Sequence, residues 1–300
     1  MKTIKNFDEL IAYLEQRGDR KRLAVVWASD SSTQHAVCKS LEHGFIEAFF
    51  IGCRKEIEKN ERLMAHSAHI HFVDTEDKDE AARLAVEMIR EGKADILMKG
   101  MINTDNLLKA VLNKETGIMR PGRVLTHVAA AFIPKYPKML CFTDAAVIPY
   151  PTQEQRIAQV HYMAYVCHAM GIETPKIALC HCSEKVQEKH FPFTVGYKEI
   201  IDKANQGEFG SCIIDGPMDV KCACSTENML QKGLASPING EADALIFPDI
   251  EAGNSFYKTI TLFCNADTAA ILQGPLCPVV LPSRADSVMS KYYSVALAVL

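Results

Sequence analysis

The residues with the most obvious chemical use lie near the end of the chain. Val279–Leu281 has the composition of a buried strand, and it breaks at Pro282 before Ser283 and Arg284. The pattern after them predicts a long helix, whose N-terminus offers unpaired N–H groups and a positive dipole end that favour a phosphate. Arg284 adds a planar cation for bidentate phosphate contact, and Ser283 adds a hydroxyl. The segment therefore indicates an anion site, unless it is only a capped helix with a surface arginine.

A second segment, Ala94–Leu112, also places polar groups directly after an expected strand. Lys99 and Gly100 follow the strand, and Asn103 and Thr104 begin the next helix. Ligands of open α/β sheets bind at the carboxyl ends of the strands, so these groups are candidates for binding. A capping turn with a solvated lysine would give the same pattern.

A third segment runs from Pro248 to Lys258 and is expected to combine a strand end, a Gly-containing loop and a helix start. Asp249, Asn254 and Lys258 supply its polar groups. One such segment is weak evidence, but three segments at strand ends favour a cleft.

Short apolar runs alternate with helical patterns through most of the chain, which predicts a parallel sheet with covering helices. The expected strands are Leu23–Ala28, Glu47–Gly52, Ile70–Val73, Asp95–Met98, Val128–Phe132, Met139–Phe142, Ile177–Cys182, Cys212–Ile214, Leu245–Phe247, Ala269–Leu272 and Val279–Leu281. The expected helices include an amphipathic one with Phe7, Leu10, Ile11 and Leu14 on one face, Asp79–Arg90, Thr104–Leu112 and Thr152–Met170. Thr152 is a candidate N-cap. No linker is apparent, so two lobes would have to be joined without a flexible tether.

Composition narrows the class of protein. Of the 300 residues, 48% are hydrophobic and 23% are charged, which is ordinary for a globular protein. The formal net charge of −4 argues against a general nucleic-acid-binding protein, which needs a basic surface. No apolar stretch is long enough to span a bilayer, and the first helix lacks the apolar core of a signal peptide. We therefore expect a cytoplasmic protein that binds neither nucleic acid nor membrane.

The eleven cysteines do not suggest disulfides or a metal site. Their number is odd and their spacing irregular, so we expect small buried hydrophobes in a cytoplasmic chain. The clusters Cys180–Cys182, Cys222–Cys224 and His66–His71 lack the ligand spacing of zinc sites, and we expect no metal. The motifs of a Rossmann dinucleotide site, a P-loop and a hydrolase nucleophile elbow are also absent from the sequence.

Taken together, the three segments resemble the phosphate acetyltransferase/phosphate butyryltransferase family, and the resemblance covers nearly the whole chain. The matching stretches are Ala94–Asp95, Lys99–Gly100, Asn103–Lys109, Thr143–Gln155, Phe247–Asp249, Gly253–Asn254, Tyr257–Lys258, Gln273–Pro275 and Ser283–Arg284. The resemblance implies an α/β fold like that of isocitrate and isopropylmalate dehydrogenases, with the second lobe inserted in the first. The implied limits are 1–127 plus 274–300 for the first lobe and 128–273 for the second. A homo-oligomer, dimer or larger, is also implied.

The family's functional residues carry over only in part. Its serine-arginine pair falls on Ser283 and Arg284, where the serine is thought to hydrogen-bond the coenzyme A thiol and the arginine to hold phosphate charge. Acetyltransferases place an aspartate, proposed as the base, seven positions beyond that serine, but this chain has Ser290 there. Asp286 is the nearest carboxylate and could be either a base or a helix cap. The family's arginine on the helix of the second segment corresponds to Lys109.

Three details are similar to the butyryltransferase branch: the SR-x-DS pattern, the turn Met98–Gly100 and the run Leu125–Ala129. The implied reaction is reversible transfer of a butyryl group between coenzyme A and inorganic phosphate, with acyl-CoA and phosphate as substrates and no cofactor. The implied substrate-binding residues are Lys99, Gly100, Asn103, Thr104, Lys109, His127, Asp249, Asn254, Lys258 and Gly274. A phosphate acetyltransferase and a non-catalytic acyl-CoA sensor are alternatives. A dehydrogenase of the same fold is disfavoured, because its metal-binding aspartates and arginine cluster are not found.

Overall fold

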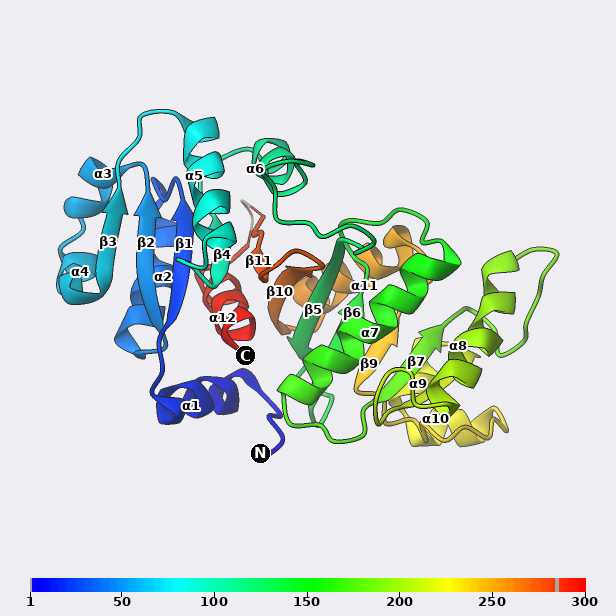
Figure 1. Ribbon diagram of the computed structural model, residues 1–300. Helices are drawn as coiled ribbons and strands as arrows, with labels where there is room; N and C mark the ends of the chain where they lie inside the picture. Colours follow the sequence, from blue (N-terminus) through cyan, green and yellow to red (C-terminus); the bar gives the residue numbers. More distant parts are fainter. Residues whose placement is uncertain (1, 284–285) are drawn as a thin grey trace. The chain divides into compact units, whose positions relative to one another are not determined.

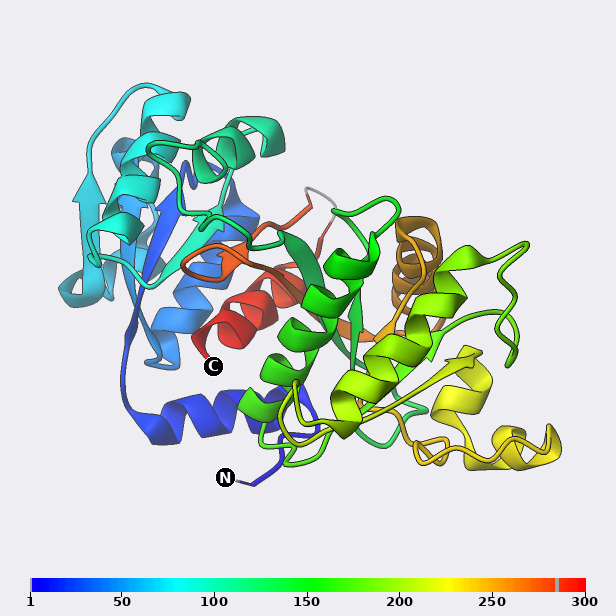
Figure 2. The same cartoon turned by 45° about the vertical axis from the view of Figure 1, so that its right-hand side comes forward.

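The structure is a computed structural model that describes residues 2–283 and 286–300 (Figures 1 and 2). Its contacts divide the chain into two compact units. The N-terminal unit comprises Phe7–Leu125 and Thr268–Leu300, and the middle unit comprises Met1–Asn6 and Thr126–Asp267. The sequence placed the boundaries at residues 127 and 274, and it assigned the first residues to the N-terminal unit. In the structure the Ile4 amide donates to the Met170 carbonyl (2.9 Å), which ties this end of the chain to the middle unit.

The N-terminal unit is built on a sheet with the strand order β3-β2-β1-β4-β11-β10. Its strands are β1 (Lys21–Val26), β2 (Ile46–Ile51), β3 (Ile70–Val73), β4 (Ile96–Lys99), β10 (Asp267–Gln273) and β11 (Val279–Val280). The pairs among β3, β2, β1, β4 and β11 are parallel, as the alternation of strands and helices predicted. β10 and β11 are antiparallel, contrary to that prediction, because residues 274–278 are too few for a crossover connection.

Helices cover both faces of this sheet (Figure 1). They are α1 (Phe7–Arg17), α2 (Ser31–Glu42), α3 (Arg54–Glu58), α4 (Glu61–Met64), η1 (Ser67–His69), α5 (Lys78–Arg90), α6 (Thr104–Val111) and α12 (Val288–Val299). α2 and α12 pack against each other, and α5 packs against β1, β2 and β4. The four apolar residues expected on one face of α1 are its buried residues, and the Phe7 ring stacks on Tyr293 with 4.2 Å between centroids. The predicted amphipathic helix is confirmed.

The middle unit has a second sheet segment with the order β5-β6-β9-β7-β8. Its strands are β5 (Thr126–Phe132), β6 (Met139–Thr143), β7 (Lys176–Cys180), β8 (Ile213–Met218) and β9 (Ala244–Ile246). β5 and β6 are antiparallel because a short loop, residues 133–138, joins them, and the other pairs are parallel. The helices are α7 (Gln153–Ala169), η2 (Pro192–Thr194), α8 (Val195–Asn205), α9 (Val220–Cys224), α10 (Thr226–Gln231) and α11 (Ile250–Phe263). Thr152 is the N-cap of α7, as predicted, and the structure adds a capping box with Gln155.

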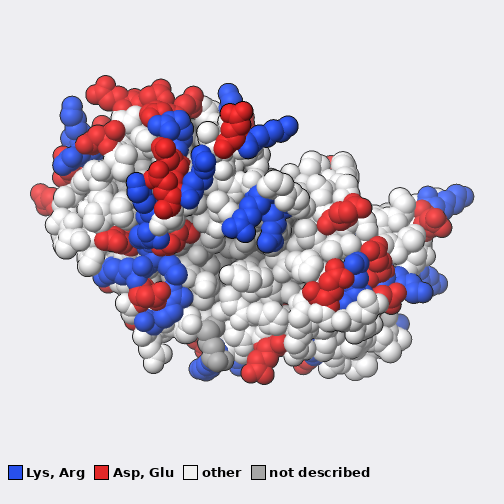
Figure 3. All heavy atoms as spheres, in the orientation of Figure 1, with Lys and Arg blue, Asp and Glu red and all other residues white. Residues whose placement is uncertain are grey.

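Helix lengths, surface charges and cysteines can be compared with the expectations from composition. Among the described residues, no helix combines the length and apolar character needed to cross a membrane. On the face in Figure 3, basic and acidic side chains are interspersed over the elements at the left, from β1 to α5, instead of forming one basic surface. None of the eleven cysteines is in a disulfide, and six of them are buried.

Candidate active site

The turn that carries Ser283 lies beside the turn that carries Lys99. β11 and β4 are parallel neighbours, with Val279 paired to Leu97 and Val280 paired to Met98. Adjacent parallel strands lie about 4.8 Å apart, and their carboxyl ends meet at one edge of the sheet. Two of the three segments singled out in the sequence therefore share one edge of the N-terminal unit.

The Ser283 turn is closed by Asp286. The Asp286 carboxylate accepts a hydrogen bond from the Ser283 amide (2.8 Å), and the Asp286 amide donates to the Ser283 carbonyl (3.2 Å). Asp286 is not the helix cap, because the N-cap of α12 is Ser287, whose hydroxyl accepts from the Ser290 amide (3.0 Å). The side chain of Ser283 is exposed. Arg284, the expected phosphate-binding residue, lies outside the described residues.

Lys99 is not the solvated lysine that a plain capping turn would have. Only 5% of the residue is exposed, and its ammonium donates to the carbonyls of Gly100 and Ile102 (both 3.3 Å). Gly100 is buried, and its amide donates to the Val26 carbonyl (2.8 Å) at the end of β1. A buried ammonium fixed at the end of β4 raises the positive potential of this edge, which favours an anion near Ser283.

The other residues expected from the second segment lie on α6. Asn103 occupies the N-cap position without a side-chain hydrogen bond to the helix, and Thr104 is the first helical residue. Both are exposed, as is Lys109. α6 packs against α5.

A buried ion pair that the sequence did not reveal supports the same edge. The Lys291 ammonium, on α12, lies 3.6 Å from a carboxylate oxygen of Asp30, and the Lys291 side chain is only 6% exposed. Asp30 is also the N-cap of α2, where it accepts from the Thr33 amide (2.8 Å). The pair ties the start of α12, and with it the Ser283 turn, to the end of β1. The position of Lys291 on the apolar side of the predicted helix was the signal in the sequence that could have indicated this pair.

In the middle unit, backbone amides engage most of the hydrogen-bonding capacity of Asp144. Asp144 follows β6 and is 1% exposed. One of its oxygens accepts from the Thr126 hydroxyl (2.7 Å) and the His127 amide (3.1 Å), and the other accepts from the amides of Ala146 and Val147 (both 2.8 Å). Asp144 therefore organises the loop after β6.

The third segment has the same structural character. Asp249 is the N-cap of α11 and accepts from the Ala252 amide (2.9 Å), and Asn254 donates to the Ala145 carbonyl (2.9 Å). The prediction of a Gly-containing loop is wrong, because Gly253 lies within the first turns of α11. A side chain there would collide with the Asp144 carbonyl, so glycine allows the helix to begin against the β6 loop.

Arg156, which the sequence analysis missed, joins these two loops. It is 2% exposed and donates to the carbonyls of Pro248 (3.0 Å) and Pro151 (3.4 Å). Its guanidinium lies over the rings of Phe193 and Tyr197, 5.5 and 5.7 Å from their centroids. Burial lowers the pKa of the guanidinium from its ordinary value. The position of Arg156 on the apolar face of the predicted helix was the signal in the sequence that could have indicated its buried role.

The remaining expected residues have mixed surroundings. His127 is half-buried, with its ring edge-on to Tyr257 at 6.4 Å between centroids. Lys258 is exposed, and its ammonium lies 4.9 Å from the Tyr257 ring centroid. Gly274 is buried with a φ of +115°, and a side chain there would collide with the Val124 carbonyl. The structure therefore gives Gly274 a packing role.

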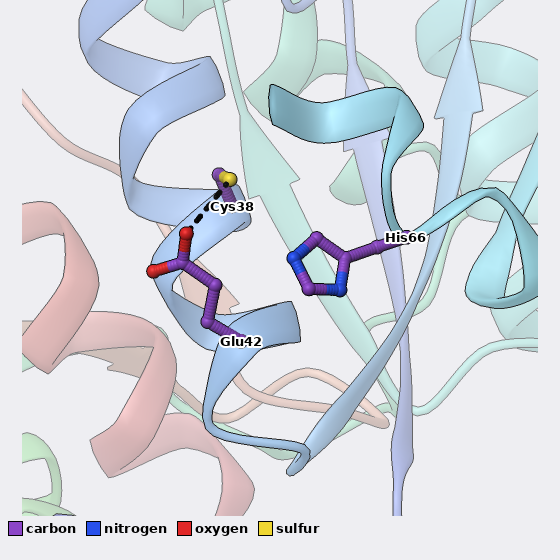
Figure 4. A group of neighbouring side chains, drawn as sticks. All are labelled: Cys38, Glu42 and His66. Carbon is purple, nitrogen blue, oxygen red and sulfur yellow. Dashed lines mark hydrogen bonds between the residues drawn. The ribbon is translucent and has the colours of Figure 1, made fainter. Parts of the chain in front are cut away.

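Two groups of described residues bring three potential metal ligands together, although no metal was expected. Figure 4 shows one of them, Cys38, Glu42 and His66. Glu42 already pairs with Arg62 through two hydrogen bonds (2.8 and 3.2 Å), and burial raises the pKa of the Cys38 thiol to about 11, which disfavours the thiolate that a metal needs.

The second group, Glu184, Asp219 and Cys222, is bridged by Lys232, whose ammonium hydrogen-bonds both carboxylates. A cation would have to displace this lysine. We therefore interpret both groups as ion-pair clusters, in which Arg62 and Lys232 already neutralise the carboxylates.

Burial also bears on covalent catalysis by cysteine. It raises the pKa of the thiols of Cys53 to about 11 and of Cys224 and Cys277 to about 12. A thiol with such a pKa is almost entirely protonated at neutral pH and is a poor nucleophile.

Comparison with known proteins decides the family. A family model described as phosphate acetyl/butaryl transferase matches residues 74–299. The chain belongs to this family. It is 36% identical to the phosphate butyryltransferase of Clostridium acetobutylicum over 99% of this chain and 98% of that protein. It is 38% identical to the phosphate acetyltransferase of Thermotoga maritima over 94% of this chain and 95% of that protein.

Solved structures of the family confirm the fold. A branched-chain phosphotransacylase from Enterococcus faecalis has 32% identity and a TM-score of 0.81, covering 93% of this chain and 97% of its own. A 4-hydroxythreonine-4-phosphate dehydrogenase from Klebsiella pneumoniae has 11% identity and a TM-score of 0.51, covering 93% and 98%. The latter likeness concerns the fold alone, and it agrees with the dehydrogenase-like architecture expected from the sequence.

Proposed function

We propose that this acyltransferase is a phosphate butyryltransferase, which transfers a butyryl group reversibly between coenzyme A and inorganic phosphate. The observation that carries the proposal is the full-length similarity to butyryltransferases. The Ser283 turn beside Lys99 supports it. An exposed hydroxyl next to a buried ammonium provides a hydrogen-bonding group for a thiol and a positive potential for phosphate.

The reaction is simplest as a direct transfer in a ternary complex. The sulfur of coenzyme A attacks the acyl carbon of butyryl phosphate, a tetrahedral oxyanion forms, and the bond to the phosphate oxygen breaks. Phosphate leaves with its electron pair, and the thiol proton passes to a base. The reverse sequence makes butyryl phosphate from butyryl-CoA, and no acyl-enzyme is needed.

The protein has two tasks in this scheme. Ser283 would hydrogen-bond the sulfur and favour its thiolate, which is a minor species at neutral pH. Arg284 and Lys99 would stabilise the charge on phosphate and the oxyanion. Asp286 is a carboxylate within the same turn, but one of its oxygens is engaged by the Ser283 amide, so Asp286 serves first to shape the turn.

Phosphate-dependent release of coenzyme A from acetyl-, propionyl-, butyryl- and isobutyryl-CoA tests the proposal. We expect the highest kcat/KM with butyryl-CoA, and each missing methylene should lower kcat/KM about tenfold or more. Release of coenzyme A without dependence on phosphate, or coenzyme A binding without release, would contradict the proposal. The second result would identify an acyl-CoA sensor.

A phosphate acetyltransferase is the second candidate, because the Thermotoga maritima relative is as similar to this chain as the butyryltransferases are. The same four substrates separate the two activities, since an acetyltransferase would give its highest kcat/KM with acetyl-CoA.

We also propose a cytoplasmic homo-oligomer, dimer or larger, that works without a cofactor. The eleven unpaired thiols fit a reducing compartment. Light scattering on the purified protein tests the oligomer. Dialysis against EDTA tests the cofactor, and we expect the rate of coenzyme A release to stay unchanged. A loss of rate that Zn²⁺ or Mg²⁺ restores would overturn this part.

A further inference from the structure

The buried polar side chains of α12 lie in its first two turns, at the end that follows the Ser283 turn. Lys291 and Ser294 are each 5% exposed, whereas residues 295–299 are buried valine, alanine and leucine. Apolar packing has no preferred direction, but hydrogen bonds and ion pairs do. The contacts that can fix the position of α12 are therefore concentrated beside Ser283.

On one side, these contacts lead to β10. The Ser294 hydroxyl accepts from the Ala270 amide (2.9 Å) and donates to the Ser290 carbonyl (2.7 Å). The Ser290 hydroxyl lies 3.3 Å from the hydroxyl of Thr268. Ser290 occupies the position where the resemblance places the aspartate of acetyltransferases, and in this chain its side chain faces β10.

On the other side, Lys291 joins α12 to α2. Its ammonium lies 3.6 Å from an oxygen of Asp30, and the same oxygen accepts from the Thr33 amide as the N-cap of α2. Side chains of an α-helix point back toward its N-terminus, so the ammonium extends toward the end of α12 that follows Ser283.

The ends of three neighbouring strands are involved. β1, β4 and β11 are consecutive in the sheet, and Asp30 follows β1, Lys99 ends β4 and Ser283 follows β11. The ion pair between Asp30 and Lys291 therefore connects the two strand ends that flank Lys99.

The surroundings of this pair do not suit a purely stabilising role. Both side chains are largely buried, and the second oxygen of Asp30 is buried without a hydrogen-bond partner in the part of the chain that the structure describes. Desolvation offsets most of the attraction within such a pair, so its net contribution to stability is small. A buried pair can instead select one arrangement of the elements that carry it.

We propose that Asp30 and Lys291 are positioning residues for acyl transfer, which hold α12 so that the Ser283 hydroxyl keeps its place near Lys99. Neither residue needs to touch the substrate. The inference rests on the proposed function, because that function makes Ser283 part of the reaction. A shift of about 1 Å in a catalytic group can lower the rate about 100-fold, so a loosened α12 should be detected in kcat.

Replacement of both partners separates position from stability. Asp30→Asn keeps an oxygen that can cap α2, and Lys291→Met keeps most of the length of the side chain. Each single substitution leaves one charge without its partner and should lower the midpoint of urea denaturation, whereas the double substitution removes both charges and should return the midpoint toward wild type. We expect the double variant to keep a kcat with butyryl-CoA about tenfold or more below wild type, with a smaller change in KM.

The Lys138–Asp243 pair of the middle unit provides the matched control. Asp243 is 5% exposed and, like Asp30, it both pairs with a lysine and accepts from a backbone amide, that of Lys176 (2.8 Å). Asp243→Asn combined with Lys138→Met should leave kcat at the wild-type value, whatever its effect on the urea midpoint.

Two results would overturn the inference. One is a wild-type kcat in the Asp30→Asn, Lys291→Met double variant. The other is a kcat that follows the urea midpoint, low in the single variants and restored in the double one, because the pair would then act through stability alone.

Hydrogen exchange in Asp30→Asn covers the case in which the double variant does not fold. The Ser283 amide, which donates to Asp286 (2.8 Å), should exchange faster than in wild type, and kcat should be lower well below the unfolding temperature. Wild-type exchange and kcat would overturn the inference. If the wild-type protein releases no coenzyme A from any acyl-CoA, the proposed function fails instead, and faster exchange in Asp30→Asn would still show that the pair holds the Ser283 turn.

Discussion

In both units polar side chains follow the buried strands, but the two sets lie in different surroundings. In the N-terminal unit, Ser283 is exposed and Lys99 points its ammonium into a turn beside it. In the middle unit, Asp144, Asp249 and Arg156 are engaged by backbone groups. Engagement by the backbone does not by itself separate the two sets, because Lys99 also donates to two backbone carbonyls. The difference is the exposed hydroxyl of Ser283 beside that buried ammonium.

The largest expected effect tests the architectural role of the middle unit. Asp144→Ala would leave four donors without their acceptor in a buried loop, so we expect the free energy of unfolding to fall by about 3 kcal/mol or more. Urea denaturation measures this loss. Asp202→Ala, at an exposed position of α8, should change stability by no more than about 0.5 kcal/mol. Equal stability of the two variants would mean that Asp144 is not structural.

The next effect tests the catalytic role of the N-terminal unit. Ser283→Ala and Arg284→Ala should each lower kcat about 100-fold or more, the range for a lost acid-base or oxyanion group. The free energy of unfolding of Ser283→Ala should stay near the wild-type value, because the side chain is exposed. Ser67→Ala, at another exposed serine, is the control for turnover. Wild-type kcat in both active-site variants would remove this site.

A smaller effect is expected at the start of α7. Thr152→Ala removes the hydroxyl of the capping box and should lower the free energy of unfolding by about 1 kcal/mol. Thr152→Ser keeps the hydroxyl and should restore most of this loss. If Thr152 only caps α7, the substitution should change the free energy of unfolding and leave kcat unaltered. This result would distinguish the middle unit from the unit that carries Ser283. A kcat that fell with Thr152→Ala and returned with Thr152→Ser would place the loop after β6 in the active site.

The smallest effect concerns the amino ends of β1 and β4 in the N-terminal sheet, where Arg22 and Asp95 lie. The Arg22 guanidinium, hydrogen-bonded to both Asp95 oxygens (3.0 and 2.7 Å), holds the pKa of that carboxyl below its ordinary value of 3.8. A lowered folded-state pKa stabilises the protein above the unfolded pKa, and this contribution is lost as the pH falls through the folded pKa. Both side chains are about one-third exposed, so Asp95→Asn should cost about 0.5 to 1 kcal/mol at pH 7.

Urea denaturation of wild type and Asp95→Asn at several pH values checks this sign. The difference between them should narrow as the pH falls below about 4, since the wild-type carboxyl is then protonated as well. A difference that widened toward acid pH would contradict the assignment.

The sequence predicted the elements well because each rests on a local pattern. The stripe from Phe7 to Leu14, the cap at Thr152 and the strand at Val279 all depend on neighbours in the chain. What it could not predict depends on long-range contacts. Gly253 looks like a loop glycine until its approach to Asp144 is known, and the antiparallel pairs follow from loop lengths as much as from strand composition.

The site shows the same division. The resemblance supplied Ser283 and Arg284, and the pairing of β11 with β4 explains why Lys99 lies near Ser283. It also supplied three residues that have structural roles. Asp249 caps α11, Asn254 donates to a backbone carbonyl, and Gly274 lies too close to the Val124 carbonyl for a side chain. Arg156 and the Asp30–Lys291 pair were missed, because a buried charge can be recognised only when its surroundings are known.

The position of β11 between β4 and β10 has a consequence for biosynthesis. The ribosome makes this strand only after the complete middle unit, so until then β4 is the open border of a half-built sheet. The unpaired backbone groups of such an edge strand can pair with other nascent chains, and a chaperone could bind there. Ser283, which we propose takes part in turnover, is made with the segment that closes this border, so we expect an incompletely folded chain to be inactive.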